Sequence, residues 1–141
     1  MKVLLLCHIE EMFAEWFPTG YRYQVCKELI TGGYDRVYAL VSGVDDDEPI
    51  EEIVEHGYEE IPWSWGYEAD PSYYDDGEGD WIVTEDAGHD ATWVPPELRE
   101  DECKTWDIYI GGGYDSECLQ DLRAVLDYMG LGYTELPEII Y

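Results

Sequence analysis

Residues 106–130 read WDIYIGGGYDSECLQDLRAVLDYMG, and this stretch decides the fold class of the chain. The apolar run that opens it is typical of a buried strand, and the three glycines at 111–113 predict a tight turn. From 116 to 129 apolar side chains return at helical intervals, and Gly130 is a typical residue for the end of a helix. The stretch therefore predicts a strand, a glycine turn and a helix that carries Cys118 in its first turn.

Strand and helix signals alternate along the rest of the chain. Residues 2–8 form a continuous apolar run, which is typical of a central parallel strand buried on both faces. Residues 21–31 space apolar side chains at helical intervals and end before two glycines. The remaining predicted elements are a short helix at 49–56 and strands at 34–41, 58–61, 81–84 and 133–141.

The alternation of these elements predicts a three-layer, Rossmann-like α/β/α fold with a mostly parallel sheet of four to six strands. Pro137 places the last strand at an edge of that sheet. The chain has 141 residues, of which 45% are hydrophobic, so we expect residues 1–141 to form a single α/β domain. The segment at about 62–80 has no clean period and predicts an acidic, aromatic-rich loop or insertion.

The apolar run at the N-terminus is too short for a signal peptide or a membrane helix, so we expect a cytoplasmic protein. The four cysteines are Cys7, Cys26, Cys103 and Cys118, and no pair has the C-x-x-C spacing of a zinc site. A reducing compartment disfavours disulfides, so most of these cysteines are expected to be small buried residues. The sequence predicts neither a metal nor a cofactor.

The net charge is −27, with 34 acidic residues against seven Lys and Arg. Residues 45–102 concentrate this charge, because they hold 22 acids and a single base, Arg99, for a local net charge of −21. Such a field repels nucleic acid and anionic membranes. Three explanations remain open: a halophilic cytoplasm, mimicry of DNA towards a basic partner, or a solvated face that keeps the protein soluble.

A catalytic arrangement is expected at the carboxyl ends of the strands, where functional groups collect in open α/β sheets. The first turn of a helix stabilises a thiolate, so Cys118 is the candidate nucleophile. His8 or His89 is the candidate base, and Glu10 or Asp90 would orient it. The opposing hypothesis is that Cys118 faces the sheet as an ordinary core residue.

The spacing around Cys118 resembles that of the isochorismatase/nicotinamidase type of cysteine hydrolases. In that family a strand ends in glycine, cysteine follows six residues later and glycine ends the helix twelve residues further on, as do Gly112, Cys118 and Gly130. The family's first strand runs into a catalytic Asp with a Phe five residues on, and here His8 and Phe13 stand at these positions. The resemblance implies the family's fold and hydrolysis of a small amide through a thiolate.

Two departures limit what the resemblance transfers. The family's catalytic Asp falls on His8, and the family's Lys has no equivalent, since no lysine occurs between Lys27 and Lys104. His89 stands roughly where the lysine segment belongs, and the sequence lacks the Asp-x-His metal motif of nicotinamidases. Cys118 is thus the single catalytic position that the resemblance carries over.

Two functions from different classes follow from these observations. The leading hypothesis is a divergent cysteine-hydrolase-like protein that acts on a small-molecule substrate through Cys118. The alternative is a non-enzymatic acidic binding protein, such as a phage-type inhibitor that mimics DNA and occupies a basic, nucleic-acid-binding protein partner. Neither hypothesis involves direct binding to nucleic acid or to a membrane, and the sequence indicates no oligomeric state.

Overall fold

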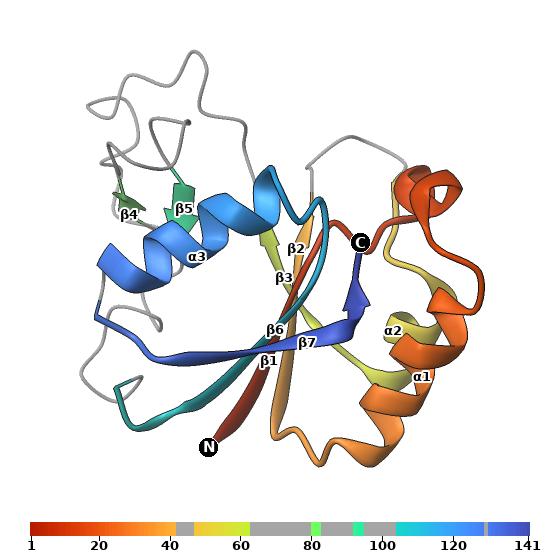
Figure 1. Cartoon of the computed structure of the whole chain (residues 1–141). Helices are drawn as coiled ribbons and strands as arrows, with labels where there is room; N and C mark the ends of the chain where they lie inside the picture. Colours follow the sequence, from red (N-terminus) through yellow and green to blue (C-terminus); the bar gives the residue numbers. More distant parts are fainter. Residues whose placement is uncertain (42–46, 63–79, 83–91, 95–103, 129) are drawn as a thin grey trace.

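A computed structural model describes residues 1–41, 47–62, 80–82, 92–94, 104–128 and 130–141. Five strands form one sheet in the order β3-β2-β1-β6-β7, and every neighbouring pair is parallel (Figure 1). Their bounds are β1 Lys2–Cys7, β2 Arg36–Val41, β3 Glu59–Pro62, β6 Asp107–Gly112 and β7 Tyr133–Ile140. The predicted sheet of four to six mostly parallel strands is therefore confirmed.

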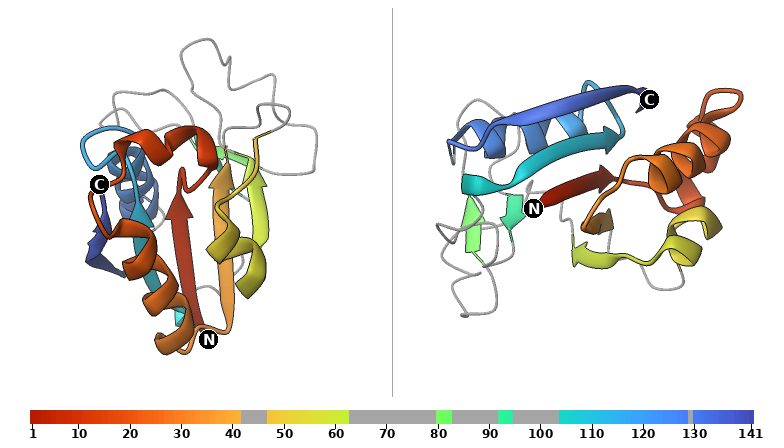
Figure 2. Two further views of the ribbon diagram at one scale, coloured as in Figure 1. Left: turned by 90° about the vertical axis from the view of Figure 1, so that its right-hand side faces the viewer. Right: turned by 90° about the horizontal axis from the view of Figure 1, so that it is seen from below.

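Helices cover both faces of this sheet. α1 (Tyr21–Thr31) and α2 (Glu51–His56) pack on one face, and α3 (Cys118–Tyr128) packs on the other (Figure 2). The remaining elements are the 3₁₀ helix η1 (Glu11–Trp16) and a separate antiparallel pair, β4 (Asp80–Ile82) with β5 (Thr92–Val94). The layers are those of the predicted α/β/α fold.

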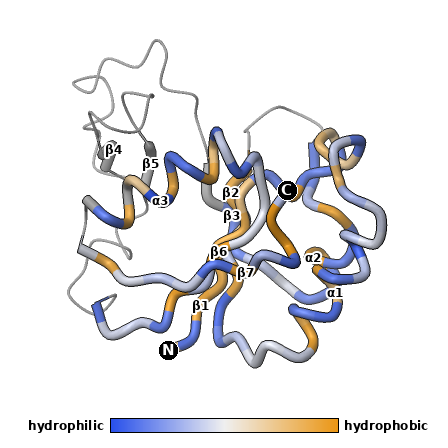
Figure 3. The backbone as a smooth tube through the Cα atoms, viewed as in Figure 1, coloured by the Kyte–Doolittle hydropathy of each residue, from blue (hydrophilic) through white to orange (hydrophobic). Residues whose placement is uncertain are grey.

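The central strand β1 is buried on both of its faces. Val3, Leu5 and Cys7 pack on the side of α3, whereas Leu4 and Leu6 pack on the side of α1 and α2. This two-sided burial explains why the strand is a continuous apolar run rather than an alternation of apolar and polar residues. Figure 3 shows the hydrophobic residues concentrated along the central strands.

The strand order creates a crossover between β1 and β6. From β1 the chain continues outward through β2 and β3 on one side, and β6 and β7 complete the sheet on the other side. Open α/β sheets bind their ligands at such a point, outside the carboxyl ends of the strands. Cys7, the last residue of β1, pairs in register with Gly112, the last residue of β6.

Gly112 allows the two backbones to approach closely at the crossover. Its φ is +92°, and a Cβ at this position would lie 2.0 Å from the carbonyl oxygen of Cys7. The N–H of Gly113 donates a hydrogen bond of 2.9 Å to that same carbonyl. The glycine turn thus ties the loop after β6 to the end of β1.

The two long helices lie close to their predicted positions. α1 has the predicted bounds, because two glycines end it. α3 begins at Cys118 rather than at residue 116, because the preceding residues form a turn. In that turn the N–H groups of Glu117 and Leu119 both donate to the carbonyl of Tyr114. Cys118 is therefore the first residue of the helix.

Two short elements were not predicted. η1 has no helical period in the sequence, and β5 has only three residues, too few for an alternating pattern. Pro137 lies in β7, which is an edge strand as predicted. Most of the predicted loop at 62–80 lies outside the described residues. In the described part of the chain, no helix is both long enough and apolar enough to cross a membrane.

Candidate functional site

The chain leaves β1 through a strained residue, His8. Its φ is +51°, a left-handed conformation that residues other than glycine seldom adopt. Two backbone contacts hold it there: its N–H donates to the carbonyl of Leu40 at 3.0 Å, and its carbonyl accepts from the hydroxyl of Tyr141 at 2.5 Å. Strain of this kind, maintained by tertiary contacts, is common at functional sites.

His8 and Glu10 form a buried pair. The Nδ1 atom of His8 lies 3.4 Å from an Oε atom of Glu10, and both side chains are at most 2% exposed. A carboxylate at one ring nitrogen orients the imidazole and sets which nitrogen carries the proton. The structure thus brings together the two residues that the sequence suggests as base and orienting group.

Cys118 occupies both environments that the sequence presents as alternatives. It is the first residue of α3, where the helix dipole favours a negative charge. It is also buried, with 2% exposure, and belongs to the core cluster between α3 and the sheet. A position at the helix start therefore does not exclude a position in the core.

Several ionisable groups lie within electrostatic range of Cys118. The pKa of the Cys7 thiol is raised, first by burial and then by the negative charges of Cys118, Glu10 and Asp121. The pKa of Tyr141 is raised by burial and, among others, by Cys7, Glu10 and Cys118. We call this set the carboxyl-edge cluster; its members are Cys7, His8, Glu10, Cys118, Asp121 and Tyr141.

Cys7, Tyr141 and Asp121 belong to this cluster but were not predicted as catalytic candidates, and Asp121 is the acid among them. It lies one helical turn after Cys118 and is buried, with 3% exposure. Burial, helped by the charge of Glu117, raises its pKa from 3.8 to about 7. The available signal was an acid on the apolar side of the helix, next to Leu122 in the sequence.

Aromatic rings adjoin the cluster. The ring of Phe13 in η1 lies 4.6 Å from that of His8, centroid to centroid. Trp16 contacts Tyr114 at 6.1 Å, and Tyr114 contacts Tyr141 at 5.5 Å. η1 itself contains no buried residue, and Trp16 is 48% exposed. The buried ionisable groups are thus next to a surface helix that contributes no buried residue to the core.

His89 and Asp90, the other candidate base and orienting group, lie outside the described residues. Of the five candidate residues, the structure places Cys118, His8 and Glu10 at one edge of the sheet. Within the ranges that are described, no three His, Cys, Asp or Glu side chains form a group that could hold a metal ion.

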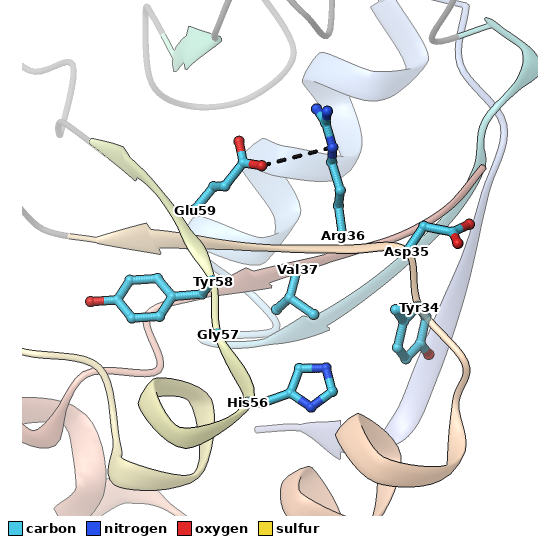
Figure 4. Close-up of a pocket in the computed structure, with 8 residues that line it drawn as sticks. All are labelled: Tyr34, Asp35, Arg36, Val37, His56, Gly57, Tyr58 and Glu59. Atoms are coloured by element: carbon cyan, nitrogen blue, oxygen red, sulfur yellow. Dashed lines mark ion pairs between the residues drawn. The ribbon is translucent and has the colours of Figure 1, made fainter.

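A hollow among the described residues lies at the opposite edge of the sheet. A cavity of about 320 Å³ opens at the amino ends of β2 and β3, and we call it the amino-edge pocket. Figure 4 shows the ring of His56 below the side chain of Val37 and the ring of Tyr34 to its right. Arg36 and Glu59 also line it and form an ion pair of 3.7 Å. This pocket shares no residue with the carboxyl-edge cluster.

Comparisons of the chain with protein-family models, with curated proteins and with solved structures each found no match. The case for a function therefore depends on the residues and geometry of the carboxyl-edge cluster.

Proposed function

We propose that the chain is a divergent cysteine-hydrolase-like protein that acts on a small amide or related carbonyl substrate through Cys118. One observation carries this proposal: at the crossover between β1 and β6, Cys118 at a helix start and Glu10 of the buried His–Glu pair both act on the pKa of Cys7. This is the part of an open α/β sheet where ligands bind. The resemblance to isochorismatase/nicotinamidase-type hydrolases supports Cys118 as the nucleophile.

The chemistry follows from the nature of these groups. The Cys118 thiolate, favoured by the helix dipole, attacks the carbonyl carbon and forms a thioester as the amine leaves. His8, oriented by Glu10, gives a proton to the leaving amine and then takes one from the water that hydrolyses the thioester. His8 therefore replaces, in position, the Asp of the family that the chain resembles. The requirement for a reduced thiol fits a cytoplasmic location.

Substrate entry requires a movement of η1. Cys118 and His8 are both buried, and Phe13 of η1 contacts the ring of His8. η1 is a short 3₁₀ helix without buried residues, so its displacement costs little core packing. Opening of η1 would expose the His–Glu pair at the carboxyl ends of β1 and β6, and closure would exclude water during the reaction.

The test uses p-nitrophenyl acetate, an activated ester that reports on thiol acylation without knowledge of the natural substrate. Cys118→Ala is expected to lower turnover of this ester at least a hundredfold, roughly the cost of removing a nucleophile. Cys26→Ala, at a half-buried cysteine of α1, is the matched control and should leave turnover unchanged. Equal turnover by the wild type and Cys118→Ala would refute the proposal.

A second candidate function, that of an acidic binding protein, is favoured by the surface around α2 and β3. Residues 47–60 contain no Lys or Arg. Their acids are Asp47, Glu48, Glu51, Glu52, Glu55, Glu59 and Glu60. Val54 lies among them and is 47% exposed, so an apolar contact is available at the centre of a negative surface. This combination suits a basic protein partner.

This second candidate function predicts that binding of a basic partner depends more on the charges around α2 than on the total charge of the protein. The double variant Glu51→Gln/Glu55→Gln is expected to weaken binding of an oligo-arginine peptide about tenfold at low salt. The control Asp127→Asn/Glu138→Gln removes the same charge elsewhere and should weaken binding much less. Equal losses in the two variants would show a non-specific field and would count against a binding surface on α2.

A further inference from the structure

Asp121 and Cys118 form a pair fixed by the geometry of α3. Residues three apart in an α-helix lie on the same face, with Cβ atoms roughly 5–6 Å apart. Both side chains are buried against the sheet, and the N–H of Asp121 donates to the carbonyl of Glu117 at 3.0 Å, which continues the helix through this turn. The spacing of the pair therefore depends on one continuous helix.

Asp121 is a buried acid on a helix that packs on the core. Leu119, Leu122 and Leu126 of the same helix belong to the core cluster that also contains residues of β1, β2 and β6. Among the described residues, the ionisable side chains that border this part of the core include Glu117 and Cys118 of α3, Cys7 of β1, Tyr38 of β2 and Tyr133 of β7. The negative charge of Asp121 contributes to the raised pKa of Cys7, so the carboxylate lies within electrostatic range of the end of β1.

We propose that Asp121 is the general base that takes the proton from the thiol of Cys118. This inference rests on the proposed function of Cys118 as a nucleophile, and it assigns the first proton transfer to a residue on the same helix. The pKa of Asp121, raised to about 7 by burial, makes its carboxylate a stronger base than an exposed Asp and suits it to accept a proton near neutral pH. His8 remains the group that serves the leaving amine and the water.

The proposed reaction is balanced. The proton moves from the Cys118 sulfur to the Asp121 carboxylate, and the thiolate forms a bond to the carbonyl carbon. The C–N bond then breaks, and the amine leaves with a proton from protonated His8. Water gives one proton back to His8, and its hydroxide attacks the thioester and releases a carboxylic acid. The thiolate finally recovers its proton from Asp121, so that amide and water have become acid and amine.

The experiment measures the rate at which iodoacetamide alkylates Cys118, followed by peptide mass spectrometry from pH 5.5 to pH 9.5. In the wild type, Asp121 and Cys118 titrate as a pair, so the rate is expected to rise with an inflection near pH 7. In Asp121→Asn the inflection should move to pH 8.5 or above, and the rate at pH 7 should fall at least about tenfold. Asp127→Asn, at an exposed acid of the same helix, is the control and should not change the profile.

A structural role for Asp121 predicts the opposite shift. If its charge only repels a thiolate, Asp121→Asn would lower the inflection and raise the rate at neutral pH. That result, an unchanged profile, or a wild-type Cys118 that stays unmodified over the whole pH range would overturn the inference. Retention of ester turnover by Cys118→Ala would instead refute the proposed function, so the two failures are distinguishable.

A second variant keeps the test valid if Asp121→Asn does not fold. Glu117 is exposed, and its charge contributes to the raised pKa of Asp121. Glu117→Gln is therefore expected to move the inflection of Cys118 alkylation to lower pH by a few tenths of a unit. A profile identical to that of the wild type would also contradict the assignment of Asp121 as the base.

Discussion

The ionisable groups at the two edges of the sheet differ in their exposure to solvent. At the carboxyl edge, Cys7, Glu10 and Asp121 are buried, and the charges of the two acids contribute to the raised pKa of Cys7. At the amino edge, Arg36 and Glu59 line an open pocket, and the two form an ion pair in contact with solvent. The amino-edge pocket therefore lies at the amino ends of β2 and β3, whereas the groups with raised pKa values lie at the carboxyl ends of β1 and β6.

This difference shows why concavity alone does not identify a reaction centre. An exposed ion pair is ordinary surface chemistry and contributes little to stability. Buried ionisable groups raise the free energy of the folded state, so their retention at a crossover point indicates a use. The strained backbone of His8 indicates the same edge. The following predictions separate the two edges experimentally.

The largest effect is expected at Gly112. In Gly112→Ala the new Cβ would overlap the Cys7 backbone, so we expect a loss of several kcal/mol in unfolding free energy, or no folding at all. Gly33→Ala is the control at the amino edge, because its φ is also positive but open space surrounds it. It should cost only about 1–2 kcal/mol. Urea unfolding measures the unfolding free energy of both variants. Similar losses in the two would mean that the backbones of β1 and β6 do not approach as closely at Gly112 as the structure shows.

The next effect concerns the pH dependence of stability. The raised pKa of Asp121 means that the folded protein binds this proton more tightly than the unfolded chain. The contribution of this proton to the unfolding free energy is complete at low pH and is lost as pH rises through about 7. At about 1.4 kcal/mol for each unit by which the pKa is raised, the loss amounts to at most about 4 kcal/mol. Asp121→Asn should lack this loss. Urea midpoints of the wild type and of Asp121→Asn at pH 5 and pH 8 test this difference. The same change in midpoint between the two pH values in both proteins would contradict the prediction.

A smaller difference is expected between two tyrosine hydroxyls. Tyr141→Phe removes the hydrogen bond to the carbonyl of the strained His8 and should cost about 1–2 kcal/mol. Tyr34→Phe removes a partly buried bond to the Glu28 carboxylate at the amino edge, and should cost less than about 1 kcal/mol. The comparison is made by thermal unfolding at one pH. A larger loss in Tyr34→Phe would reverse the proposed order of the two edges.

The smallest effect is expected for the ion pair beside the amino-edge pocket. Arg36 and Glu59 are both exposed, and the distance between Nε and Oε1 is 3.7 Å. A double-mutant cycle with Arg36→Gln and Glu59→Gln should give a coupling of at most about 0.5 kcal/mol that disappears at high salt. A coupling above 1 kcal/mol would show that this edge also contains strongly interacting charges.

Most of the fold was predictable, because its signals are local. The apolar run at 2–8 and the helical spacing at 21–31 each reflect burial of a single element, and glycines mark where elements end. The meeting of His8, Glu10 and Cys118 at one edge was predictable too, since the carboxyl ends of parallel strands share an edge. These expectations needed only the order of strands and helices.

The rest depends on contacts between distant parts of the chain. An acid within a helix is usually exposed, and only the packing of α3 against β1 reveals that Asp121 is buried. The hydroxyl of Tyr141 reaches the carbonyl of His8 across 133 residues of sequence, which no local pattern indicates. η1 has no period to predict it, yet its Phe13 contacts the ring of His8.

The central claim is that Cys118 forms a covalent bond to substrate carbon at the carboxyl edge. The most direct measurement is peptide mass spectrometry of protein quenched in acid during turnover of p-nitrophenyl acetate. The account predicts an acetyl group on Cys118 that accumulates and then disappears as the ester is consumed, with Cys7 and Cys26 unmodified. Acetylation of other residues alone, with Cys118 free at every time point, would contradict it.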